Sequence, residues 1–173
     1  MVLKILISLL IVCAAALVAH TVDRVRKRER NKMSFMEAFN LTEMTIVTLF
    51  NNGHKLNFLL DTGSNNAYIS KSASQIEGLS YEVIPTQGTN VTGSVGQCSC
   101  TEAIRISLTY KDYTYNTDLF VLDTLDESFK SIKESDGVQL HGILGTLFLQ
   151  KHNFVLDFDE LIAYKKNERN NHA

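Results

Sequence analysis

The chain has 173 residues, of which 45% are hydrophobic and 21% are charged, and its net charge is −2. This length and composition suit one globular domain with an appendage and argue against a low-complexity chain. Residues 1–33 hold seven Lys or Arg and two acids, a net of +5. The rest holds 17 − 7 = 10 basic and 19 − 2 = 17 acidic residues, a net of −7, which argues against nucleic acid as its main partner.

The N-terminus is strongly apolar. Residues 5–19 are apolar apart from Ser8 and carry no charge, and a helix over 2–22 would be about 31 Å long, enough for a hydrocarbon core of about 30 Å. The basic run at 24–32 resists translocation and favours the cytoplasmic side. We therefore predict a transmembrane anchor over 1–22 with the remaining chain in the cytoplasm. Small residues near the end of the apolar run leave a second interpretation open, a cleaved signal with a secreted or periplasmic product.

The next residues divide into three predicted parts. Residues 23–40 are polar and basic, and we expect them to be a tether with a short helical stretch around 33–39. The folded domain is expected over 41–166. A polar tail, 167–173, follows it.

Most of the predicted domain has the patterns of β-strands. Residues 44–50 and 54–60 are strand-like and are separated by Asn-Asn-Gly at 51–53, a typical hairpin turn. Short apolar runs or alternating apolar and polar side chains predict further strands at 67–70, 103–110, 114–123 and 154–164.

Helices are scarce. Thr124 and Glu127 have the spacing of a capping box, and Leu125, Phe129 and Ile132 would form the apolar face of the helix that follows. A second short helix is expected over 146–152. The predicted fold class is therefore all-β, closed or sandwiched, with one or two short helices.

Asp61 ends an apolar strand and is followed by Thr62, Gly63 and Ser64. Asp, Gly and Ser dominate ordinary turns, so this stretch could be only a strand-end turn. However, a partly buried carboxylate needs hydrogen-bond donors, and the two hydroxyls and the backbone of a tight glycine turn can supply them. The second interpretation is a catalytic carboxylate. A second apolar segment ends at Gly145, and its Leu144 lies 144 − 61 = 83 residues after the aspartate.

In this order, the segments resemble the retropepsin-like aspartic proteases, which are single-domain relatives of the pepsins. The pattern of that family is an apolar strand into Asp-Thr/Ser-Gly, a glycine-containing flap hairpin, and two apolar residues with glycine before a short helix. Residues 58–64, 88–97 and 142–149 match these three parts, and the resemblance covers about 44–165. It implies a closed, barrel-like fold.

The resemblance also implies a homodimer, because Asp-Thr-Gly occurs once in this sequence and one chain would supply half a site. Asp61 from each subunit would share a proton and activate water. Thr62 would lock the two loops together, the Gly63 amide would approach a carboxylate, and Ser64 would hydrogen-bond its outer oxygen. The supporting residues would be Ile143, Leu144 and Gly145, and the substrate-binding flap tip would be Val91, Thr92, Gly93, Ser94 and Val95.

The expected activity is thus a membrane-anchored aspartic endopeptidase with a peptide substrate and no cofactor. No metal site is expected, because the spacings of His54, His141 and His152 match no common ligand set. Asp157 and Asp159 are expected on a solvated edge face. Two alternatives are a retropepsin-like adaptor without activity and an exported β-domain with a fortuitous turn at Asp61. Residues 122–140 exceed the family pattern and could cover the cleft or alter the dimer edge.

Overall fold

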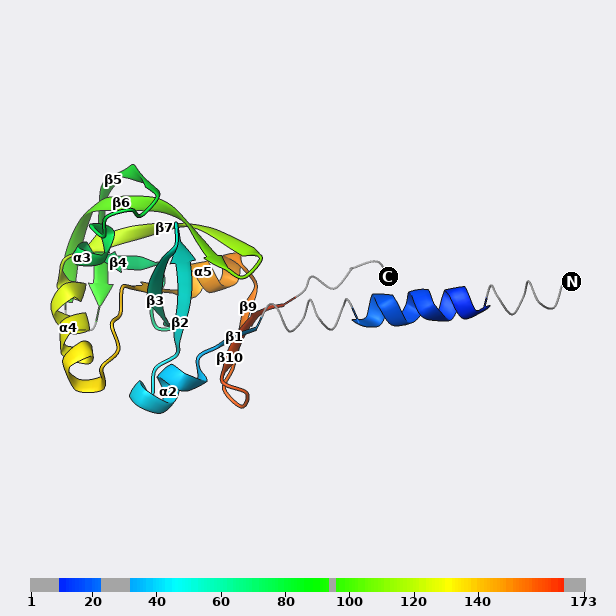
Figure 1. The fold of residues 1–173 in the computed structure, drawn as a ribbon. Coiled ribbons are helices and arrows are strands. Elements are labelled where there is room, and N and C mark those ends of the chain that lie inside the picture. Colours follow the sequence, from blue (N-terminus) through cyan, green and yellow to red (C-terminus); the bar gives the residue numbers. More distant parts are fainter. Residues whose placement is uncertain (1–9, 23–31, 94–95, 167–173) are drawn as a thin grey trace, which may run out of the picture. The chain divides into compact units, whose positions relative to one another are not determined.

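A computed structural model describes residues 10–22, 32–93 and 96–166, without the side chains of 87–99 and 101 (Figure 1). The chain divides into two compact units, Met1–Lys32 and Met33–Ala173. Residues 10–22 of the first unit are helical. Within the described residues, no helix has both the length and the apolar content that a membrane span requires. Residues 1–9 of the predicted anchor lie outside that description, and so do residues 23–31 of the predicted tether and the tail from 167 onward.

The second unit is mostly β-structure. Its strands are β1 (Lys32–Ser34), β2 (Ile46–Asn51), β3 (His54–Leu60), β4 (Tyr68–Ser70), β5 (Tyr81–Gly93), β6 (Gly96–Tyr110), β7 (Tyr113–Leu122), β8 (Gly142–Leu144), β9 (Phe154–Asp157) and β10 (Ile162–Lys165). Its helices are α2 (Met36–Thr42), α3 (Lys71–Ser74), α4 (Thr124–Asp136) and α5 (Thr146–Lys151).

Seven strands form a closed sheet. Their order is β2-β3-β8-β4-β7-β6-β5, and an additional pairing of β2 with β6, at Phe50 and Thr109, closes the barrel. Closure removes most of the free strand edges. The predicted all-β closed barrel is therefore confirmed.

The shortest strands lie in the middle of this sheet. β8 pairs in parallel with β3, so that Leu60 lies opposite Leu144, and antiparallel with β4. β4 in turn pairs in parallel with β7. As a result, the end of β3, where Asp61 begins, lies beside a strand from much later in the chain.

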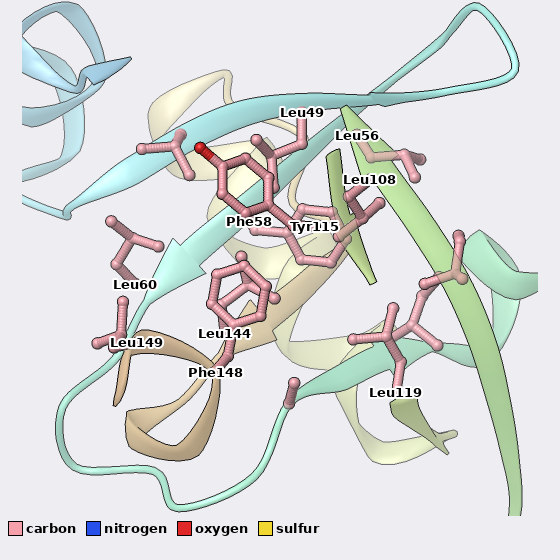
Figure 2. Packing of buried hydrophobic residues seen from close by; sticks show 14 of the residues in the cluster. Leu49, Leu56, Phe58, Leu60, Leu108, Tyr115, Leu119, Leu144, Phe148 and Leu149 are labelled. Atoms are coloured by element: carbon pink, nitrogen blue, oxygen red, sulfur yellow. The ribbon is translucent and has the colours of Figure 1, made fainter. Parts of the chain in front are cut away.

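The core fills the inside of this barrel. Figure 2 shows Leu49, Leu56, Phe58, Leu144 and Phe148 converging with Tyr115 on one apolar centre. Each of these side chains is at most 3% exposed. The end of β3, β8 and α5 are therefore held in place by one shared core.

A smaller sheet has the order β1-β10-β9. Met33 and Phe35 are buried in the main core, so the folded unit begins at Met33 rather than at residue 41. The prediction of one strand over 154–164 was wrong, because the chain turns between β9 and β10. Asp157 Oδ1 accepts the amides of Asp159 and Glu160 and thereby makes that turn.

Helix α4 lies within the segment that exceeds the family pattern. The predicted capping box is wrong, because the N-cap residue is Asp123 and no side chain caps the helix. The predicted apolar face of α4 does pack, with Phe129 buried beside Leu125 and Ile132. Its partners include Leu59 of β3 and Ile143 of β8, so α4 covers an outer face of the barrel next to the central strands.

Candidate active site

Asp61 begins the loop between β3 and β4. Its backbone amide donates to the Leu144 carbonyl at 3.1 Å. Its carboxylate oxygen Oδ1 accepts the Gly63 amide at 2.8 Å, and the Ser64 amide donates to the Asp61 carbonyl at 3.3 Å. Asp61 is half-buried, while Thr62 and Gly63 are exposed. The carboxylate is thus fixed on one side and faces solvent on the other.

The other end of the loop is held by α5. The Thr146 amide donates to the Ser64 carbonyl at 2.8 Å, and the Thr146 hydroxyl donates to the same oxygen at 3.2 Å. The Leu147 amide donates to the Asn65 carbonyl at 3.0 Å. These contacts use the Ser64 backbone, whereas the sequence analysis assigned a role to its hydroxyl. The first turn of α5 therefore serves as the support of the loop.

Two glycines permit this close packing. A Cβ added at Gly145 would collide with the Asn66 carbonyl oxygen and would lie 2.6 Å from the Ser64 carbonyl oxygen. A Cβ at Gly142 would collide with the Tyr68 carbonyl oxygen and approach the Phe58 ring at 2.6 Å. A side chain at Gly145 would push the start of α5 away from the loop, and one at Gly142 would push β8 away from β4 and from the Phe58 ring of β3.

The predicted supporting residues contact different parts of the molecule. The Leu144 side chain is fully buried in the barrel core, and its carbonyl accepts from Asp61. Ile143 packs on the outer face with the α4 residues. Gly145 provides the close approach to the loop. Leu144 and Gly145 therefore contact the Asp61 loop, whereas Ile143 links β8 to α4.

The predicted flap is part of a hairpin formed by β5 and β6. Backbone pairing joins Val91 with Cys98, Thr92 with Gln97, and Gly93 with Gly96. Ser94 and Val95 lie outside the described residues, as do the side chains of the other predicted flap residues. The hairpin is present, and the substrate-binding role of its tip stays a prediction.

His141, directly before β8, was not predicted as part of the site. Its Nδ1 accepts the Asn57 amide at 3.0 Å, and its own amide donates to the Asn57 carbonyl at 2.9 Å. Its carbonyl accepts the Ser70 amide at 2.9 Å. His141 thus connects β3, β4 and β8 at the start of the pairing that ends at Asp61. Its position one residue before the Gly-Ile-Leu-Gly segment was the available sequence signal.

His152 follows α5 directly and lies in an aromatic cluster. Its ring centroid is 4.7 Å from that of Phe148 and 5.2 Å from that of Tyr115. Its Nε2 is buried without a hydrogen-bond partner, and so is the Tyr115 hydroxyl. The cluster anchors the last turn of the helix that supports the Asp61 loop.

Burial perturbs three titratable groups near this support. Desolvation lowers the pKa of His141 below its usual range, and Lys133 adds a smaller lowering effect. Desolvation also lowers the pKa of His152, with Lys151 acting in the same direction. Burial raises the pKa of Tyr115. Both histidines are therefore neutral at physiological pH.

The described residues include no group of three or more His, Cys, Asp or Glu side chains that could hold a metal ion. The Asp61 carboxylate instead accepts the Gly63 amide, and the hydroxyl residues Thr62 and Ser64 lie in the same loop. This combination suits proton transfer and hydrogen bonding to a water or a carbonyl.

Comparisons with known proteins agree with the architecture. No family model and no curated protein matches the chain. Among solved structures, the retroviral protease-like domain of Ddi1 from Leishmania major matches with a TM-score of 0.52 and 17% identity, covering 72% of this chain and 89% of that one. EIAV protease in complex with the inhibitor HBY-793 matches with a TM-score of 0.46 and 21% identity, covering 65% and 90%. The chain has a retropepsin-like fold.

Proposed function

We propose that the chain is an aspartic endopeptidase that acts as a homodimer, with Asp61 of each subunit forming a catalytic pair. The observation that supports this most strongly is the conformation of the Asp-Thr-Gly-Ser loop. Its carboxylate accepts the Gly63 amide, its carbonyls accept amides from α5, and its amide donates to β8. A free strand-end turn needs none of these long-range contacts.

The proposed mechanism follows from the electrostatics of two carboxyl groups about 3 Å apart. They cannot both ionise easily, so the pair shares one proton. The ionised Asp61 removes a proton from a bound water, while the protonated Asp61 donates to the scissile carbonyl. The titration belongs to the pair rather than to either residue. Thr62, which is exposed, would contact the loop of the other subunit.

The substrate would be an extended peptide. Its backbone would pair with the β5–β6 hairpin above and the loops below, as in other cases of strand addition. The predicted tip residues 91–95 would close over it. Substitutions at 91–95 would test whether these residues bind the peptide.

Membrane attachment is part of the same proposal. The helix at 10–22 leaves large apolar side chains exposed to solvent, and these are Leu10, Ile11, Val12, Leu17, Val18 and Val22. With the preceding apolar residues they would form the anchor, and the basic run after it would keep the second unit in the cytoplasm. Confinement to a bilayer would raise the effective concentration of subunits and favour dimers.

The test compares the wild-type chain with Asp61→Asn on a peptide library, with and without pepstatin. We expect cleavage by the wild type that pepstatin inhibits, and none by Asp61→Asn. Specific activity should rise with protein concentration, since one subunit has half a site. Equal cleavage by both chains would refute the peptidase. A folded wild type that cleaves nothing at any concentration would favour the adaptor alternative.

The location is tested separately. A reporter domain fused after Ala173 should give a cytoplasmic signal and should remain with the membrane after a carbonate wash. A signal from outside the cytoplasm would instead favour the exported product.

A further inference from the structure

The segment that supports the Asp61 loop has a histidine at each end. His141 immediately precedes β8, and His152 immediately follows α5. The segment between the two histidines contacts the loop at several points. These are the Leu144 carbonyl, the close approach of Gly145, and the amides of Thr146 and Leu147. A change at either histidine therefore acts on the same support.

At His141, the constraint is the direction of a hydrogen bond. The Asn57 backbone N–H can only donate, so Nδ1 must be the unprotonated acceptor. Protonation would place two donors against each other, and the ring or the strand would have to move. β3 continues from Asn57 to Leu60 and then to Asp61, so a shift there is transmitted along the strand that positions the carboxylate.

The surroundings of His141 offer little compensation for a positive charge. Burial disfavours the charged ring most strongly and Lys133 of α4 acts in the same direction, whereas the Asn57 backbone favours the charged form less than burial disfavours it. The other contacts of His141 are backbone groups of β3 and β4, at Asn57 and Ser70. The residue is only partly exposed, so burial disfavours the charged form of the ring.

At His152, the constraint is the apolar packing. Protonation would create a charged donor at Nε2, which is buried and has no partner. Phe148 of α5 and Tyr115 of β7 pack against the ring, and both Lys151 and Lys165 repel a positive charge there. The Asn116 backbone favours the charged form of the ring, but less than burial disfavours it.

We propose that His141 and His152 are positioning residues for Asp61 and that both must be neutral imidazoles to keep β8 and α5 against the Asp61 loop. The expected effect on catalysis rests on the proposed peptidase function, whereas the expected effect on the support of the Asp61 loop does not. The site would be complete at neutral pH and would lose its support as the pH falls below about 6.5, the ordinary range of histidine.

The test measures hydrogen exchange of the full chain at pH 7.5 and pH 5.5, corrected for the intrinsic pH dependence of exchange. Peptides covering 56–66 and 141–152 report on the loop and its support, and a peptide from β6 and β7, 103–120, serves as the internal reference. We expect exchange in the first two peptides to be faster at pH 5.5, by up to about tenfold for each histidine whose pKa is depressed, because each one can increase the population of the open form about tenfold per pH unit.

The matched variants are His141→Asn, whose side-chain oxygen can take the place of Nδ1 without titrating, and His152→Phe, which keeps an aromatic ring. The double variant should keep its protection at pH 5.5. Unchanged wild-type exchange, or an equal acid-induced loss in the double variant, would overturn the proposal. If the double variant does not fold, the wild-type profile and each single variant still decide the question.

Peptidase activity provides the second measurement. If Asp61-dependent cleavage is found, kcat should fall on the acid side in the wild type and recover in the double variant, while KM changes little. Cleavage that depends on Asp61 but lacks this recovery would refute only the positioning role. An exchange effect without any cleavage would refute only the peptidase.

Discussion

Two aspartates in this molecule form the same local hydrogen bond in different surroundings. Oδ1 of Asp61 accepts the Gly63 amide, and Oδ1 of Asp157 accepts the amides of Asp159 and Glu160. These bonds of Asp157 stay within its own hairpin, and the turn residues Asp159 and Glu160 are exposed. The Asp61 loop is also bonded to β8 and α5. The distant backbone contacts, not the aspartate turn, therefore distinguish the candidate site.

The largest effect should come from Gly145→Ala, which removes the close approach of α5 to the loop. The added Cβ would collide with the Asn66 carbonyl oxygen and lie 2.6 Å from that of Ser64. Because both atoms belong to the backbone, we expect a loss of more than about 3 kcal/mol or no folded protein. Chemical denaturation measures this loss.

The control is Gly53→Ala in the turn between β2 and β3, where a Cβ has open space and only the positive φ of 85° opposes it. Equal losses in the two variants would mean that the close approach has no special importance.

The second comparison truncates one leucine in each region. Leu144 of β8 is completely buried, whereas Leu156 of β9 is half-buried at the edge of the core. We expect Leu144→Ala to cost about 3–5 kcal/mol and Leu156→Ala about 1–2 kcal/mol, since the cost grows with the cavity left behind. Urea denaturation of both variants measures the difference. A larger loss for Leu156→Ala would contradict the comparison.

A smaller effect is expected from Asp157→Ala, which removes the acceptor of two turn amides. Solvent can replace the lost acceptor, so the free energy of unfolding should fall by only about 1 kcal/mol. Asp159→Ala in the same exposed turn is the matched control and should change stability by less than about 0.5 kcal/mol. Activity should be unaffected by either variant. Loss of peptide cleavage in Asp157→Ala would show that this turn also belongs to the site.

The smallest effect should come from Asp118→Asn on β7. The Arg105 guanidinium donates to Asp118 at 2.8 Å and lowers the pKa of that carboxyl, but both side chains are about half exposed. A depressed carboxyl pKa stabilises the fold above the ordinary range of Asp, about 3.9, and this contribution disappears as the pH falls through the lowered value. Water and salt screen an exposed pair, so the denaturation midpoint at pH 7 should not change measurably. A clear drop at pH 7 that vanishes at pH 3 would show that the pair matters.

Local patterns in the sequence predicted most of the strands but missed β1 and most of β5, and the family resemblance predicted the closed barrel. The hairpin of β2 and β3, the alternation in β6 and the apolar strand before Asp61 all follow from side-chain period and turn chemistry. The family pattern correctly predicted that the Gly142–Leu144 strand would meet the loop. The bond from the Asp61 amide to the Leu144 carbonyl joins residues 144 − 61 = 83 apart, which no local rule specifies.

The remaining errors have physical reasons. The alternation over 154–164 continued through a turn, because Asp157 supplies the acceptor that reverses the chain. The predicted capping box failed because α4 begins one residue earlier than the box requires, so that Asp123 is the N-cap and Thr124 is already part of the helix. Met33 and Phe35 were assigned to a tether because the neighbouring residues are basic, yet tertiary packing buries both. The roles of His141 and His152 depend on contacts across the barrel and could not be read from their spacing.

The bond from the Asp61 amide to the Leu144 carbonyl also determines when the site can exist during biosynthesis. A nascent chain that has reached residue 140 carries the whole aspartate loop but neither the strand nor the helix that holds it. Contacts between distant segments form late, because the intervening chain must first be ordered. An incompletely translated copy would therefore have the acid without the backbone contacts that fix its geometry.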